Sequence, residues 1–241
     1  MNTDLFGNKV VKNPILIERF IEPPFSVLNA NSARWRNRKR QWKKLGIESH
    51  LSREGILTIK DSFSSDRYGR KSMETVSIFD PVLCEIIYSW YCPDGGKILD
   101  PFAGGSVRGI VANYLGYNYT GIDIRQEQVD SNREQALKLL PINKQPQYYV
   151  GDSNVVIPEL TQMYDFVFSC PPYADLEVYS DIAQDLSTMQ YGDFINAYNE
   201  IIHKAISKLK KGGYACFVVG DIRDKKGFYR NFISHTKQAF I

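Results

Sequence analysis

From residue 76 onward, short apolar runs alternate with longer amphipathic stretches. The runs typical of strands are "KILD" (97–100), "NYTGID" (118–123), "PQYYVGD" (146–152), "YDFVFSC" (164–170) and "YACFVVGD" (214–221). Between and around them, helical patterns cover residues 80–92, 104–116, 125–140, 191–213 and 229–241. This alternation predicts an α/β fold with a mostly parallel sheet and helices on both faces. Right-handed crossovers then leave few topologies open.

The first 75 residues are polar, basic and weakly periodic, with Pro14, Pro23 and Pro24 as breaks. We therefore divide the 241 residues into an accessory region, 1–75, and a ligand-binding domain, 76–241. Residues 33–47 are expected to form a helix ending at Gly46, and residues 62–74 a loop. No run has the length of a membrane span, and the N-terminus lacks the pattern of a secretion signal, so we expect a cytoplasmic protein.

The segment "KILDPFAGGSVRGI" places a glycine-rich turn between a strand and a helix. A ligand can approach the backbone closely at such a turn, at the carboxyl end of a parallel strand. Asp100 ends this strand, Asp123 ends the next about 20 residues beyond the glycines, and Asp152 ends the third. Asp123 lies where a carboxylate reaches ribose hydroxyls, and an acidic Asp100 suits a cationic ligand or an amino group better than phosphate.

Together with "CPPY" (170–173), these motifs resemble those of phage-like S-adenosylmethionine-dependent DNA methyltransferases, which modify exocyclic amino groups of adenine or cytosine. The resemblance covers roughly residues 76–225 and implies a Rossmann-like class I methyltransferase fold. It further implies that Asp123 holds the ribose of S-adenosylmethionine, that Asp152 contacts the adenine, and that Phe79 lies beside the cofactor. The complete set of cofactor-binding residues expected from it is Phe79, Asp100, Pro101, Phe102, Ala103, Gly104, Gly105, Asp123, Ile124, Asp152 and Ser153.

The resemblance makes Cys170, Pro171, Pro172 and Tyr173 the catalytic loop. The residue before the two prolines and a proline-linked carbonyl are expected to accept hydrogen bonds from the target amino group, while Tyr173 stacks on a flipped base. Cys170 departs from this pattern, because sulfur is a weak acceptor and the family has Asp, Asn or Ser there.

Three interpretations of Cys170 stay open. It is a tolerated substitute, with backbone carbonyls orienting the amino group; or a nucleophile for methylation of cytosine carbon 5, with Glu177 as the nearby acid; or a small buried residue at a strand end. The carbon-5 enzymes place their cysteine after a proline, which counts against the second interpretation. RNA methylation and non-catalytic DNA binding are further alternatives for the whole chain.

The segment "RWRNRKRQWKK" (34–44) combines basic residues with two tryptophans, although the whole chain carries a net charge of only +3. That mixture is typical of surfaces that hold phosphates and stack on bases, so we expect double-stranded DNA as the partner. The alternative is a solvated basic helix whose tryptophans anchor it to the core. The expected contacts are Arg34, Trp35, Arg36, Arg38, Lys39, Arg40, Trp42 and Lys43.

The cysteines and the C-terminus give the last expectations. Cys84, Cys92, Cys170 and Cys216 form no metal-type spacing, which predicts reduced thiols and no metal site. After the fifth strand a single helix precedes Ile241, so strands six and seven of the family's sheet are expected to be absent. We expect a segment around "ILTIK" (56–60), or another subunit in a homo-oligomer or a complex, to cover the open edge.

Overall fold

The computed structural model describes residues 27–47, 57–58, 78–174, 177–178, 180–224 and 226–241, with backbone alone at 57–58 and 177–178. The predicted loop 62–74 lies outside these residues.

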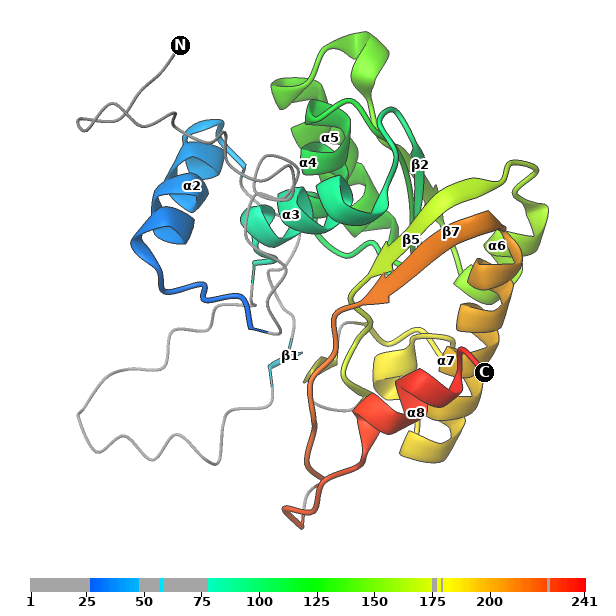
Figure 1. Cartoon of the computed structure of the whole chain (residues 1–241). Coiled ribbons are helices and arrows are strands. Elements are labelled where there is room, and N and C mark those ends of the chain that lie inside the picture. Colours follow the sequence, from blue (N-terminus) through cyan, green and yellow to red (C-terminus); the bar gives the residue numbers. More distant parts are fainter. Residues whose placement is uncertain (1–26, 48–56, 59–77, 175–176, 179, 225) are drawn as a thin grey trace, which may run out of the picture.

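Five parallel strands form the central sheet (Figure 1). Across the sheet their order is β4-β3-β2-β5-β7, and each neighbouring pair is parallel. Counted along the chain this is the order 3-2-1-4-5 of the class I methyltransferase core, so the predicted fold class is confirmed. The strands are β2 Lys97–Asp100, β3 Asn118–Asp123, β4 Gln147–Val150, β5 Tyr164–Ser169 and β7 Leu209–Phe217.

Helices cover both faces of the sheet (Figure 1). Side chains alternate along each strand: Ile98 faces the cluster that contains α3 and α4, whereas Leu99 faces the cluster that contains α6, α7 and α8. The helix α2 packs on the outside of α3, and both of its tryptophans belong to the first cluster. The helices are α2 Ala33–Lys44, α3 Pro81–Tyr91, α4 Val107–Tyr114, α5 Gln126–Leu139, α6 Ser153–Glu159, α7 Tyr191–Ser207 and α8 Phe232–Gln238, with 3-10 turns η1 Ile142–Lys144 and η3 Leu186–Thr188.

Aspartates begin two of the helices that flank the cavity described below. The side chain of Asp80 accepts a hydrogen bond from the Val82 N–H, with Pro81 in the first turn of α3. Asp152 caps α6 in the same way, through the Asn154 N–H. Both capping aspartates are among the residues that line the cavity.

Three details differ from expectation. The helix predicted over 191–213 ends at Ser207, because Leu209 already pairs with Tyr164 of β5. The short helix α6 was not predicted; it contains Pro158, which masks its pattern. Within "ILTIK", β1 Leu57–Thr58 pairs with β6 Glu177–Val178 and not with the sheet edge.

The outer edge of β7 has no strand paired to it within the described residues. The segment that follows β7 forms an isolated bridge between Arg223 and Tyr229 and then enters α8. The expected absence of strands six and seven therefore agrees with the described part of the chain, and a second subunit at this edge stays a prediction. None of the described helices is long and apolar enough to cross a membrane.

Candidate active site

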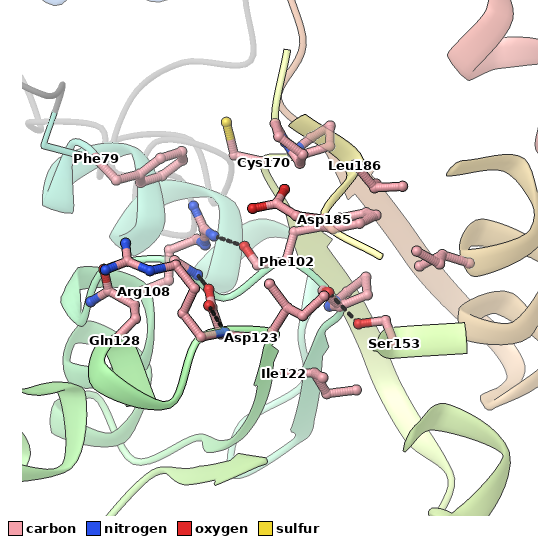
Figure 2. Close-up of a pocket in the computed structure, with 18 of the residues that line it drawn as sticks. Phe79, Phe102, Arg108, Ile122, Asp123, Gln128, Ser153, Cys170, Asp185 and Leu186 are labelled. Atoms are coloured by element: carbon pink, nitrogen blue, oxygen red, sulfur yellow. Dashed lines mark hydrogen bonds between the residues drawn. The ribbon is translucent and has the colours of Figure 1, made fainter. Parts of the chain in front are cut away.

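A cavity of about 570 Å³ lies at the carboxyl ends of the strands (Figure 2). The chain continues from β2 to β3 on one side and from β5 to β7 on the other, so β2 and β5 flank the topological switch point, where ligands bind in folds of this type. The loops after β2 and β5 carry the two motifs singled out above. The lining residues are Lys39, Ile78, Phe79, Asp80, Pro101, Phe102, Gly104, Gly105, Arg108, Ile122, Asp123, Ile124, Arg125, Gln128, Gly151, Asp152, Ser153, Cys170, Pro171, Pro172, Tyr173, Gln184, Asp185, Leu186, Ile201 and Val218.

The glycine-rich loop after β2 is held by hydrogen bonds along its length. The Ala103 N–H donates to the Ile122 carbonyl at 2.8 Å, and the Gly104 N–H donates to Oδ2 of Asp123 at 2.9 Å. The Gly104 carbonyl accepts from Asn132 Nδ2 at 2.6 Å. Gly104 has a φ of +48°, which an L side chain rarely adopts. The loop therefore presents a rigid backbone to the cavity.

Asp100 joins this loop to the Cys170–Tyr173 loop. Its side chain is fully buried. One carboxylate oxygen accepts from the Phe102 N–H and from the hydroxyl of Ser169, the last residue of β5; the other accepts from Arg108 Nε at 2.5 Å and the Tyr119 hydroxyl at 2.6 Å. The two motifs are thus fixed relative to each other by one carboxylate.

This position corrects the expectation for Asp100. Neither Asp100 nor Ala103, which is also fully buried, lies among the lining residues. The negative charge of Asp100 is compensated by the buried guanidinium of Arg108, so it does not select a cationic ligand. The other predicted cofactor residues all line the cavity, and their binding role stays a prediction.

Arg108 is the main lining residue that sequence reasoning missed. Its Nη2 donates to the carbonyls of Phe102 and Ala103, and its guanidinium lies 4.8 Å from the centre of the Phe79 ring. An arginine two positions after the turn serine, Ser106, looked like an ordinary helix residue in the sequence. Only the tertiary contact with Asp100 reveals that it shapes the cavity.

Asp123 presents acceptor capacity to the cavity. Each of its oxygens accepts one backbone hydrogen bond, from Gly104 and from Arg125, both at 2.9 Å. Desolvation raises the pKa of Asp123 to about 6, although these two hydrogen bonds act to lower the pKa. A carboxylate in this state gains from further hydroxyl donors, because each one stabilises its charged form.

Asp152 and Ser153 line the cavity next to Asp123. One oxygen of Asp152 caps α6, as described above. Ser153 donates its hydroxyl to the Pro101 carbonyl at 2.6 Å, so this side chain supports the glycine-rich loop (Figure 2). Asp123, Ile124, Asp152 and Ser153 therefore line the cavity at the carboxyl ends of β3 and β4.

The loop Cys170–Tyr173 lines the cavity at the carboxyl end of β5. Pro171 is buried, while Cys170 and Tyr173 are half-buried. The Tyr173 ring contacts Phe232 of α8 edge-on at 6.1 Å, and Ala174 turns the chain with a φ of +50°. Glu177 lies in β6, but its side chain is outside the described part of the structure, so its predicted role stays a prediction.

The other cysteines differ from Cys170 in their surroundings. Burial raises the pKa of Cys84 well above its usual value, that of Cys92 to about 12 and that of Cys216 to about 11. These thiols are therefore protonated and unreactive at neutral pH. Among the four cysteines, Cys170 is the one on the cavity wall. The described residues contain no cluster of metal-binding side chains.

Three further lining residues, Gln184, Asp185 and Leu186, come from the segment after β6. The Asp185 carboxylate points into the cavity between Phe102 and Cys170 (Figure 2). It is buried and accepts from the Ser187 N–H at 2.8 Å and from the Ser180 hydroxyl at 2.7 Å.

The expectation that the tryptophans of α2 stack on bases is wrong. Trp35 and Trp42 are 4% and 3% exposed, and their indole nitrogens donate to Asp80 at 3.2 Å and to Glu85 at 2.7 Å. The alternative of a core-anchored basic helix describes them correctly.

The same face of α2 also carries two paired cations. Arg38 forms an ion pair with Glu85, and Lys39 lies 2.7 Å from Asp80. Residues 35, 38, 39 and 42 thus form one helical face against α3. The exposed side chains on the rest of the helix include Arg34, Arg36, Arg40, Lys43 and Lys44, whose nucleic-acid contacts stay predictions.

No protein-family model matches the sequence, and no curated protein matches it. Similar solved structures include TrmN from Thermus thermophilus, with 18% identity, a TM-score of 0.46, and coverage of 58% of this chain and 38% of TrmN. A TehB-like SAM-dependent methyltransferase from Corynebacterium glutamicum has 15% identity, a TM-score of 0.41, and coverage of 65% and 70%. The magnesium protoporphyrin IX methyltransferase ChlM from Synechocystis, with bound SAM, has 12% identity, a TM-score of 0.41, and coverage of 66% and 65%.

This chain thus spans less than two thirds of the length of TrmN and of ChlM. Likeness this distant says nothing about substrate, and the fold assignment rests on the strand order given above.

Proposed function

We propose that the chain is an S-adenosylmethionine-dependent methyltransferase acting on an exocyclic amino group of a flipped base in DNA. One observation carries the proposal: a single cavity at the switch point is lined by the glycine-rich loop with Asp123 and by the Cys170–Tyr173 loop. A methyl donor at one end of such a cavity faces a base at the other.

The first end fits the cofactor. A volume of about 570 Å³ lies within the usual range for small-molecule sites. The free acceptor capacity of Asp123 suits the two ribose hydroxyls, and Asp152 lies beside it for the adenine amino group. Among the described residues, Nη1 of Arg108 donates to no acceptor, which suits the carboxylate of the methionine moiety. When bound, S-adenosylmethionine supplies a methyl group on a positively charged sulfur.

The second end fits an amino group on a planar base. Tyr173 offers a ring for stacking, and Phe232 supports that ring from the core side. Pro171 and Pro172 have no N–H, so the loop offers carbonyl acceptors without competing donors. Hydrogen bonds to these carbonyls aim the amino lone pair at the methyl carbon. The nitrogen–carbon bond then forms as the carbon–sulfur bond breaks, and one amino proton leaves to solvent.

The charge distribution supports DNA as the partner. Lys39 and Asp80 line the cavity, so α2 stands next to it. Arg36, Arg40 and Lys44 recur at every fourth residue on the exposed side of α2, where phosphates can reach them. Their position next to the cavity is what an enzyme needs to hold a duplex over its active site.

The test is nucleoside analysis after incubating the protein with labelled S-adenosylmethionine and plasmid DNA, with transfer RNA in parallel. The proposal predicts N6-methyladenine or N4-methylcytosine in the DNA. Transfer to RNA alone would replace DNA as the substrate. No methylated nucleoside in either nucleic acid, together with no binding of the cofactor, would refute the proposal.

The variant Cys170→Ser separates the two mechanisms on the same substrates. A hydroxyl accepts hydrogen bonds better than a thiol, so amino methylation should persist or increase. Carbon-5 methylation requires a thiolate that adds to the base, and it should disappear in this variant. Loss of activity with 5-methylcytosine as the wild-type product would establish that mechanism.

A further inference from the structure

Between β7 and α8 the chain forms a tight hairpin, residues 222–230, described except for residue 225 (Figure 1). Arg223 and Tyr229 form an antiparallel bridge, and the Arg230 N–H donates to the Ile222 carbonyl at 2.9 Å. Oδ1 of Asp224 accepts from the N–H groups of Lys226 and Phe228, both at 2.9 Å. These bonds define the backbone of the turn.

The hairpin is anchored at its base beside the catalytic loop. Ile222 is 3% exposed, and Phe232, two residues after Arg230, packs edge-on against the Tyr173 ring at 6.1 Å. On the other side, the Tyr191 hydroxyl donates to the Arg230 carbonyl at 2.9 Å. The hairpin follows β7 and the catalytic loop follows β5, and these strands are parallel neighbours. Both segments therefore leave the same edge of the sheet side by side.

The tip presents two aromatic side chains to solvent. Phe228 is 69% and Tyr229 is 62% exposed. The Arg223 guanidinium lies 3.8 Å from the centre of the Tyr229 ring and also donates to the Gly227 carbonyl at 2.6 Å. The side chain of Phe228 is apolar and exposed to water, and the turn fixes its backbone. It is therefore positioned to contact an apolar or planar partner.

We propose that this hairpin is a wedge for duplex nucleic acid, with Phe228 stacking where the target base leaves the helix and Arg223 and Lys226 facing phosphates. The inference rests on the proposed function and specifies how the duplex is opened. Aromatic side chains inserted into a base stack are an established means of opening or bending a duplex, and the surrounding cations match the backbone charge. A wedge next to the catalytic loop stabilises the gap that a flipped base leaves behind.

The test compares Phe228→Ala with wild type on two duplexes that contain the methylated site. In one the target base is paired; in the other it faces an abasic position and is already unpaired. The wedge lowers the cost of opening, so kcat/KM should fall about tenfold or more on the paired duplex and less than about threefold on the other. Equal losses on both duplexes, or no loss on either, would overturn the proposal.

Two controls separate this result from other causes. Ile142→Ala removes an apolar side chain that is 81% exposed in η1, and it should change neither rate. If wild type transfers no methyl group, the proposed function fails, and fluorescence anisotropy with the same duplexes tests the wedge by itself. Wild type should then prefer the duplex with the abasic position and Phe228→Ala should lose that preference; no preference in wild type would contradict the wedge.

Discussion

Asp100 shows how one buried residue organises both halves of the cavity. Its carboxylate holds the start of the glycine-rich loop and, through Ser169, the base of the catalytic loop. Arg108 compensates its charge inside the protein. The buried Asp100 therefore shapes the cavity through the loops that it positions, while Asp123 and Asp152 line the cavity themselves.

Burial of Asp123 lowers the stability of the folded protein at neutral pH. Its pKa rises from 3.8 in the unfolded chain to about 6 in the fold, so the folded protein resists ionising this group. The stabilisation that the protonated form provides is complete below about pH 4 and is lost as the pH rises through about 6, by up to about 3 kcal/mol. Asp123→Asn cannot ionise and should not show this loss.

We therefore expect the melting temperature of Asp123→Asn, relative to wild type, to increase between pH 4 and pH 7. Thermal unfolding of both proteins across this range measures the effect. Asparagine also replaces one hydrogen-bond acceptor by a donor, which lowers the stability of the variant by the same amount at every pH. The informative quantity is therefore how the difference in melting temperature between variant and wild type changes with pH. A difference that stays constant across the range would contradict a raised pKa at Asp123.

At the scale of elements, α4 depends on a glycine inside the helix. An added Cβ on Gly109 would clash with the Tyr148 hydroxyl and lie 3.1 Å from the Tyr119 ring, both in the core. Gly109→Ala should lower the free energy of unfolding by roughly 1–3 kcal/mol through overpacking, despite the better helix propensity of alanine.

Gly192 in α7 is the matched control, because nothing lies within 4 Å of a Cβ added there. Gly192→Ala should leave stability unchanged or raise it by up to about 1 kcal/mol. Urea unfolding of the two variants distinguishes the cases. Equal stability of Gly109→Ala and wild type would show that α4 can move away from the sheet.

The elements also show where sequence patterns were sufficient. Runs such as "KILD" and "NYTGID" correspond to β2 and β3 residue for residue, because each has a buried, mostly apolar centre between polar ends. The start of β7 was hidden, since "LKKGG" lies at an exposed sheet edge and continues the polar pattern of the preceding helix. The buried face of α2 contacts the carboxylates of Asp80, which caps α3, and of Glu85 within α3. No local sequence pattern reveals these contacts.

At the scale of the whole molecule, the order of the strands places the site. Because β2 and β5 are neighbours whose connections run in opposite directions, the two sequence motifs that follow them must meet. The meeting of these motifs could therefore be predicted from the sequence. The contributions of Arg108 and Asp185 could not, because each comes from a segment whose position depends on tertiary packing.

We propose that this cavity holds S-adenosylmethionine, with Asp123 at the ribose. Isothermal titration calorimetry with S-adenosylhomocysteine, the product form of the cofactor, tests it most directly. We predict one site per chain for wild type at pH 7.5, unchanged binding by Tyr173→Ala and at least about tenfold weaker binding by Asp123→Asn, the loss of a charge-assisted hydrogen bond. The absence of binding by folded wild-type protein, or equal binding by all three, would contradict the account.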